Sequence, residues 1–232
     1  MNPLQFRERE IFETLKALKN SEFVIIGGYA VNVYTLPRFS IDCDIVVKGK
    51  DQLKEINDQL TKRNYKKIKT FDTKIPDHGE FFKYEKLIEN NFKASIDIMF
   101  NEVLDRQSKA TFSAAWVIEN SDLINLRGKT ITENLKLRIV NLDALIVMKI
   151  SSCRNTDIRD VFMLITKAKN IMWIKEEVNK RYNFKEKYDK LKQTITSAKF
   201  KDNLQGVYGL IDEKTFEKHK KAILELKKEK RS

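Results

Sequence analysis

Apolar and polar positions follow two different periods along this chain of 232 residues. Apolar residues at helical spacing predict helices over 4–18, 29–36 and 51–65. Short apolar or alternating runs predict strands over 23–26, 40–47, 66–72, 80–86 and 93–100. Beyond residue 143 the pattern is helical almost to the end.

This order of elements predicts an α+β fold with two parts. Strands and helices alternate in residues 1–140, which predicts a mixed β-sheet with flanking helices. Residues 141–232 predict an all-helical C-terminal domain with a basic tail. No Gly-rich, Pro-rich or low-complexity linker separates the two, so the boundary near residue 140 marks a change of architecture.

The strand over 40–47 carries two aspartates on one face. Side chains two apart share a face of a strand, so Asp42 and Asp44 point the same way. The other face is apolar and is predicted to face the core; its residues are Ile41, Cys43, Ile45 and Val47. Two carboxylates about 7 Å apart at their Cα atoms repel each other unless a cation lies between them, and Mg²⁺ is the usual solution.

A third aspartate repeats this arrangement on a later strand. Asp97 alternates with the apolar Ile96 and Ile98, so it also faces away from a buried side. If the two strands are neighbours, the three acids converge. Such a triad can hold two Mg²⁺ ions that clamp a triphosphate and activate an attacking hydroxyl.

Two adjacent glycines precede the first pair of acids. Gly27 and Gly28 end one predicted strand and open a helix, where the backbone can approach a ligand closely and the helix N-terminus favours negative charge. This predicts a place for phosphates.

Together these residues resemble the nucleotidyltransferase superfamily typified by DNA polymerase beta. Its signature is a strand ending in Gly-Gly or Gly-Ser, a helix, Asp-x-Asp or Asp-x-Glu on the next strand, and a later isolated Asp. The resemblance implies that residues 1–140 are a catalytic domain with a nucleotidyltransferase-type sheet. The lead-in "RFSIDCD", with Arg38 and Ser40, resembles the branch of abortive-infection and toxin–antitoxin nucleotidyltransferases. Both residues are then expected to bind nucleotide.

A second motif of that branch is similar to "RIVNLDALIVMKISSCRNTDIRDVFML". The resemblance places Lys149 on a helix facing the triphosphate, followed by Arg154, Asp157 and Asp160. The bend "SSCRNT" is shorter than in the branch. Arg154 and Asp157 can alternatively form an i, i+3 ion pair on a helix surface.

The formal net charge is +12, and most of it lies in the final third. Residues 167–232 hold 19 basic and 10 acidic side chains. Such a surface attracts RNA through counterion release, or it is a set of solvated Lys/Glu helices. The interleaved aromatics fit base stacking or an apolar helix stripe: Phe184, Tyr188, Phe200, Tyr208 and Phe216.

Several classes of protein are disfavoured by the sequence. No apolar run is long enough to span a membrane, and the first ten residues lack a signal-peptide core, so a cytoplasmic location is expected. Cys43 and Cys153 suggest reduced thiols. His78 is expected on a loop, either solvated or near a substrate.

The sequence therefore predicts a Mg²⁺-dependent enzyme that moves a nucleoside monophosphate from a nucleoside triphosphate, ATP among them, to a hydroxyl. By resemblance the acceptor is an RNA 3′ end such as that of a tRNA, and the enzyme is a toxin with an antitoxin partner. One alternative is transfer to an aminoglycoside or a protein hydroxyl. Another is a non-catalytic nucleotide-binding or RNA-binding module of the same fold.

Overall fold

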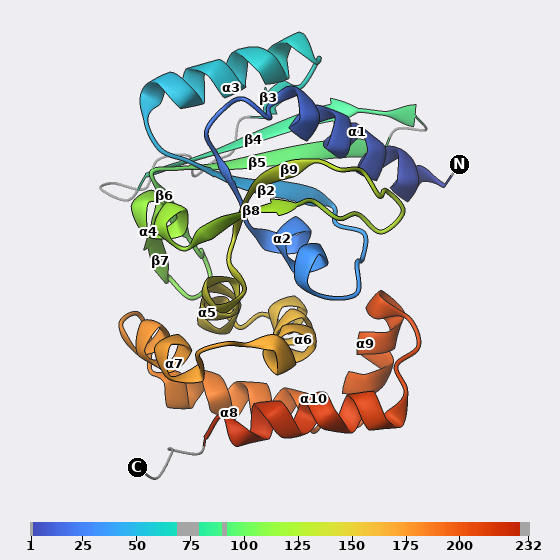
Figure 1. Cartoon of the computed structure of the whole chain (residues 1–232), viewed down its shortest axis with the longest axis vertical. Coiled ribbons are helices and arrows are strands. Elements are labelled where there is room, and N and C mark those ends of the chain that lie inside the picture. Colours follow the sequence, from blue (N-terminus) through green and yellow to red (C-terminus); the bar gives the residue numbers. More distant parts are fainter. Residues whose placement is uncertain (1, 69–78, 90–91, 228–232) are drawn as a thin grey trace. The chain divides into compact units, whose positions relative to one another are not determined.

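The computed structural model describes residues 2–68, 79–89 and 92–227 (Figure 1). The chain divides into two compact units. The first comprises Met1–Val33, Pro37–Leu104 and Thr111–Asn141, and the second comprises Tyr34–Leu36, Asp105–Ala110 and Leu142–Ser232. The sequence-based division at residue 140 stays a prediction. It does not include the two short segments Tyr34–Leu36 and Asp105–Ala110, which come before residue 140 but belong to the second unit.

A seven-stranded mixed sheet forms the centre of the first unit. Its strand order is β3-β4-β5-β2-β1-β9-β8. The bounds are β1 Val24–Ile25, β2 Asp42–Val47, β3 Lys66–Ile68, β4 Glu80–Leu87, β5 Lys93–Phe100, β8 Ser121–Asn125 and β9 Lys136–Val140. The pairs β2–β5 and β1–β9 are parallel, and the other neighbours are antiparallel.

Two helices cover one face of this sheet: α1 (Pro3–Ala17) and α3 (Lys50–Lys62). Helix α1 starts where the side chain of Asn2 accepts the N–H of Leu4, with proline at the first helical position. Two side chains of β4 reach these helices, because Tyr84 donates to Asn57 of α3 at 2.7 Å and Lys86 pairs with Glu10 of α1 at 2.9 Å.

The remaining elements of the first unit are short. Helix α2 spans Gly27–Tyr34, and a two-stranded sheet of β6 (Glu102–Leu104) and β7 (Thr111–Ser113) precedes α4 (Ala114–Glu119). Sequence analysis assigned none of β6, β7, α4, β8 and β9. Residues 69–72 of one predicted strand, and His78, lie outside the described residues.

The prediction that Ile41 lies in the core is wrong. Strand β2 begins at Asp42, and the preceding Ile41 is 70% exposed. Ile41 lies before the ladder with β5, whose first pair is Asp42 with Ser95, so period-two alternation does not extend to it. Cys43, Ile45 and Val47 are buried as expected.

The described elements of the second unit after residue 141 are all helical. They are α5 Leu142–Ser152, α6 Asn155–Leu164, η2 Ile165–Lys167, α7 Ile171–Asn179, α8 Phe184–Ile195, α9 Phe200–Tyr208 and α10 Glu213–Glu225. Phe162 lies at their centre, with its ring centroid 5.1 Å from those of Phe200 and Phe216. The predicted mixed α+β architecture is confirmed. None of the described helices is long and apolar enough to cross a bilayer.

Candidate functional site

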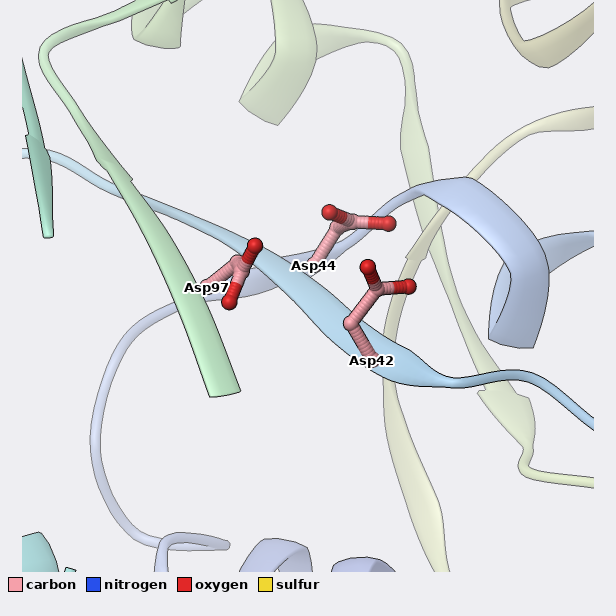
Figure 2. Close-up of side chains that lie close together, drawn as sticks. All are labelled: Asp42, Asp44 and Asp97. Atoms are coloured by element: carbon pink, nitrogen blue, oxygen red, sulfur yellow. The ribbon is translucent and has the colours of Figure 1, made fainter. Parts of the chain in front are cut away.

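The three predicted acids lie on two neighbouring strands of the sheet. Strands β2 and β5 pair in parallel with Asp44 opposite Asp97, so these side chains share a face. Asp42 lies on the same face two residues earlier (Figure 2). One carboxylate oxygen from each of the three lies within 4.8 Å of the other two.

Asp97 is the most buried member of this carboxylate triad. It is 8% exposed, and Ser95 Oγ donates a hydrogen bond to its Oδ1 at 2.7 Å. Burial raises the pKa of the Asp97 carboxyl and the charge of Asp42 adds to the rise, while the Ser95 hydrogen bond and the Lys83 ammonium oppose it. The fold therefore holds a carboxylate where its charge is disfavoured, which a bound cation would correct.

The two glycines lie directly beside the triad and its lead-in. Gly27 has φ +65°, and a Cβ atom there would be 1.9 Å from Asp44 Oδ2. A Cβ atom on Gly28 would be 2.4 Å from Ser40 Oγ and 3.4 Å from Arg38 Nη1. A larger residue at Gly27 would clash with the Asp44 carboxylate and strain the positive φ, and one at Gly28 would displace the Ser40 hydroxyl. Four of the predicted nucleotide-binding residues thus meet at the start of α2: Gly27, Gly28, Arg38 and Ser40.

Asn32 fixes the loop that carries Arg38, and sequence analysis missed it. The Asn32 side chain is fully buried in α2. Its Nδ2 donates to the Arg38 carbonyl at 2.8 Å, and its Oδ1 accepts the Arg38 N–H at 2.9 Å. These two hydrogen bonds hold the loop between α2 and β2 against α2 and fix the position of the Arg38 backbone. A polar residue on an otherwise apolar helix was the available signal.

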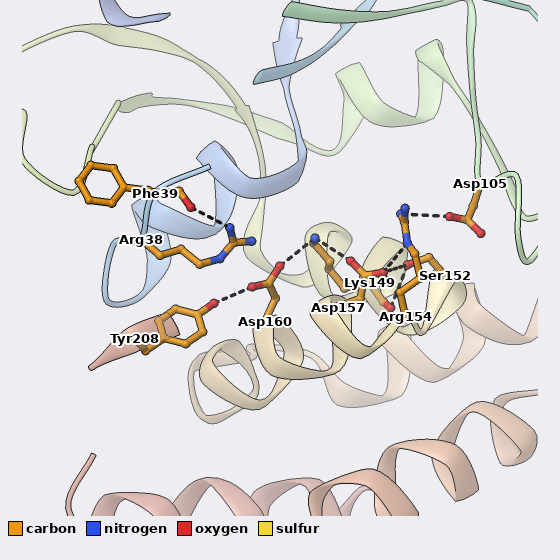
Figure 3. A network of polar contacts seen from close by, with 9 residues as sticks. All are labelled: Arg38, Phe39, Asp105, Lys149, Ser152, Arg154, Asp157, Asp160 and Tyr208. Atoms are coloured by element: carbon orange, nitrogen blue, oxygen red, sulfur yellow. Dashed lines mark hydrogen bonds and ion pairs between the residues drawn. The ribbon is translucent and has the colours of Figure 1, made fainter. Parts of the chain in front are cut away.

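Lys149 belongs to a second polar cluster, in the helical unit (Figure 3). Its Nζ lies 2.8 Å from Asp157 Oδ1 and 2.9 Å from Asp160 Oδ2. Burial alone would lower the pKa of Lys149, but Asp160 and Asp157 outweigh it and raise this pKa above its usual value. Burial alone would raise the pKa of Asp157, but Lys149 and Arg154 lower it.

The predicted Arg154–Asp157 ion pair is present, and it joins an exposed guanidinium, with 55% of the Arg154 side chain accessible, to a buried carboxylate. Arg154 Nε lies 2.9 Å from Asp157 Oδ2, and the Asp157 side chain is only 3% exposed. Ser152 Oγ donates to the same oxygen at 2.6 Å, Tyr208 donates to Asp160 at 2.6 Å, and Arg154 also pairs with Asp105 at 3.1 Å. Sequence analysis missed Asp105, Ser152 and Tyr208. Asp105 and Tyr208 lie far along the chain from their partners, and Ser152, although close in sequence, is one of several polar residues of the bend.

The aromatics of the basic region pack in the core. Tyr188, Phe200, Tyr208 and Phe216 are each at most 6% exposed, which favours the apolar-stripe interpretation over base stacking for these four. Many lysines of α8 to α10 remain exposed, among them Lys190, Lys192, Lys214, Lys218 and Lys221.

The carboxylate triad has the donor set of a divalent-cation site. Hard cations such as Mg²⁺ take carboxylate oxygens, and one or two aspartates usually hold them together with substrate phosphates. The Gly27–Gly28 turn lies next to these oxygens in the same unit. The arrangement can therefore bind a triphosphate with its metal ions and can accept a proton at Asp97.

Comparison with known proteins identifies a family. A family model described as "Nucleotidyl transferase AbiEii toxin, Type IV TA system" matches residues 11–230. No curated protein matches the chain.

Solved structures share the fold at low sequence identity. A candidate nucleotidyltransferase from H. pylori matches with a TM-score of 0.57 and 15% identity, covering 97% of this chain and 95% of that one. JHP933 from Helicobacter pylori gives 0.52 and 15%, covering 97% and 92%. MenT4, a nucleotidyltransferase toxin from Mycobacterium tuberculosis H37Rv, gives 0.55 and 11%, covering 96% and 82%.

Proposed function

The chain belongs to the AbiEii family of nucleotidyltransferase toxins, and from this membership we propose that it moves a nucleoside monophosphate from a nucleoside triphosphate to the 3′ end of an RNA such as a tRNA. The chain is thus an enzyme of the nucleotidyltransferase class. An antitoxin protein is the expected partner, and a cytoplasmic location stays a prediction. The nucleotide, the acceptor and the metal are proposals that rest on the site.

The observation that carries the proposal is the convergence of Asp42, Asp44 and Asp97 beside the Gly27–Gly28 turn. A module that only binds nucleotide or RNA gains nothing from three carboxylates gathered within 4.8 Å, because like charges at that separation repel. The triad therefore favours catalysis over the non-catalytic alternative.

Each residue of the site has a role in the proposed reaction. Asp42, Asp44 and Asp97 would hold Mg²⁺, proposed as two ions, and the backbone at Gly27 and Gly28 would bind triphosphate oxygens. When bound, such ions neutralise triphosphate charge and increase the acidity of the attacking hydroxyl.

The proposed transfer exchanges one bond at the α-phosphorus for another. The acceptor oxygen bonds to the α-phosphorus, the bond from that phosphorus to the bridging oxygen breaks, and pyrophosphate leaves. Asp97 would take the hydroxyl proton, because its carboxylate lies in the triad that would hold the ions and the attacking hydroxyl together.

A triphosphate contact by Lys149 stays a prediction, as do roles in substrate binding for Arg154, Asp157 and Asp160. Two buried carboxylates already compensate the Lys149 ammonium. A structural role for this cluster therefore has a specific observation behind it, and its loss should destabilise the helical unit.

RNA binding by the C-terminal region is proposed from its exposed lysines. Deleting residues 184–232 would not test this, because the deletion removes Phe200 and Phe216 from the packing around Phe162. Changing Lys190, Lys214 and Lys218 to Gln keeps the core. We expect these changes to weaken RNA binding and to make its salt dependence shallower.

The experiment that tests the function is incubation with each labelled nucleoside triphosphate, Mg²⁺ and one acceptor class at a time. The acceptors are total RNA, an aminoglycoside and a protein mixture. Label on the RNA 3′ end is the expected result, and Asp44→Asn should abolish it. Label on the aminoglycoside or protein alone would contradict the RNA acceptor, and no transfer to any of the three would favour a binding module.

A further inference from the structure

The polar face of the sheet does not stop at the triad but continues onto β4. In the antiparallel β4–β5 ladder, Lys83 lies opposite Asp97 and Glu85 lies opposite Ser95. Residues that pair across an antiparallel ladder share a face, with Cβ atoms about 5 Å apart. Two polar rows therefore cross three strands: Asp44, Asp97 and Lys83 in one row, and Asp42, Ser95 and Glu85 in the next.

The placement of the intervening residues confirms this face. Tyr84 and Lys86 contact α3 and α1 on the covered side of the sheet. Lys83 and Glu85 alternate with them along β4, so they lie on the opposite side, together with Asp97.

Positive charge exceeds negative charge on this extension. Lys83 Nζ lies 3.6 Å from Glu85 Oε1, and Lys93 Nζ lies 2.6 Å from Glu85 Oε2. Two ammonium groups thus share a single carboxylate. Lys83 lies opposite Asp97, Glu85 links Lys93 to Lys83, and the Lys93 side chain remains 56% exposed.

The strand order places the glycine turn and the two lysines on opposite sides of the triad. The glycine turn follows β1, on one side of β2, whereas Lys83 and Lys93 lie on β4 and β5, on the other side. If the triphosphate binds at the glycines, an attacking hydroxyl that gives its proton to Asp97 approaches from the side of β4.

We propose that Lys83 and Lys93 bind a phosphate group that lies next to the reacting hydroxyl of the acceptor. The inference rests on the proposed function and adds to it two acceptor-binding residues and one property of the acceptor, a negative charge close to its hydroxyl. A phosphodiester next to a terminal ribose has this charge. A cationic aminoglycoside does not, so it offers Lys83 and Lys93 no anionic group to bind.

The test measures transfer to two short oligoribonucleotides with a free 3′ hydroxyl. One has an ordinary last phosphodiester, and the other has a neutral methylphosphonate at that linkage. For the unaltered protein, the methylphosphonate should raise the acceptor KM about tenfold or more, as expected for the loss of a charge-assisted contact. Lys83→Met should raise the acceptor KM for the phosphodiester by a similar factor, with the KM for nucleoside triphosphate unchanged, and should make the two acceptors nearly equivalent.

A matched control is Lys86→Met, on the same strand but the covered face. It should leave the preference for the phosphodiester intact, even if it lowers the melting temperature. An unaltered protein that transfers equally well to both oligonucleotides would overturn this inference alone, as would a Lys83→Met protein that keeps the full preference. An unaltered protein that transfers to neither would overturn the proposed RNA acceptor and this inference with it.

Discussion

Among the described residues, two groups of three aspartates, one in each unit, differ in what surrounds their carboxylates. Asp42, Asp44 and Asp97 gather oxygens within 4.8 Å on one sheet face. In the helical unit, the aspartates at 105, 157 and 160 alternate with cations, because Arg154 pairs with Asp105 and Asp157, and Lys149 pairs with Asp157 and Asp160.

The pKa directions express the same difference. Burial raises the pKa of Asp97 in the first group, whereas Lys149 and Arg154 more than offset burial and lower the pKa of Asp157 in the second. Acids kept together at a cost in free energy favour a ligand site, and acids neutralised by cations favour a structural network. The following predictions separate these two roles.

The largest expected effect comes from Asp97→Asn. Transfer should fall by about a thousandfold or more, since the change removes both a proposed metal ligand and the proposed proton acceptor. Nucleotide affinity should fall far less, because the glycine turn is intact. A radiolabel transfer assay under single-turnover conditions, with nucleotide binding measured separately, checks this.

Asp122→Asn is the control for that variant. Asp122 is an exposed aspartate on the edge strand β8, so transfer and melting temperature should both match the parent. An Asp97→Asn protein that transfers at the parent rate would remove the mechanism from the proposal.

Breaking the second cluster should act mainly on stability. Lys149→Met leaves Asp157 and Asp160 buried without their shared ammonium, and such a loss costs about 3–5 kcal/mol. Urea unfolding monitored by circular dichroism measures this. A variant with parent stability but much weaker nucleotide binding would instead support a triphosphate contact by Lys149.

The hydrogen bonds from Asn32 to the Arg38 backbone support the arrangement of residues beside the first group of aspartates. Asn32→Ala removes two hydrogen bonds to the Arg38 backbone and should cost about 2 kcal/mol of stability. It should also raise the KM for nucleoside triphosphate, because Arg38 and Ser40 lose their position beside Gly28. The double variant Asn32→Ala, Arg38→Ala should show no further rise in KM over Arg38→Ala; additive effects on KM would show that Asn32 does not act through Arg38.

The smallest effect is a pH dependence in the helical cluster. The folded-state pKa of Asp157 is lowered, so its stabilising contribution is present above its unfolded value of about 4 and is lost as pH falls through the folded value. The stability difference between the parent and Asp157→Asn should therefore shrink as pH falls below about 4. A difference that stays constant down to pH 2 would show that Asp157 acts through packing and not through its charge.

Sequence analysis predicted most residues of the candidate site on the sheet face and few of the residues around it. Period-two alternation placed Asp42, Asp44 and Asp97 away from the core, and the glycines marked the turn, because both signals are local. The register that sets Lys83 opposite Asp97 depends on pairing between strands.

Long-range contacts were also missed. The bond from Tyr208 to Asp160 joins residues 48 positions apart, and no local pattern encodes it. Strands β6 and β7 have three residues each, too few for a recognisable alternation, whereas β8 and β9, with five residues each, were missed although their length allows one.

The most direct test of the central claim uses Mn²⁺ as a probe for the proposed Mg²⁺ site. Its binding is measured by electron paramagnetic resonance in the presence of nucleoside triphosphate. The parent and Asp157→Asn proteins should bind the ion alike at neutral pH, with two ions per chain at saturation. Asp44→Asn and Asp97→Asn should each weaken binding by about tenfold or more, since each removes an anionic ligand. Equal Mn²⁺ affinity in all four proteins would contradict the assignment of the sheet aspartates as the metal and catalytic centre.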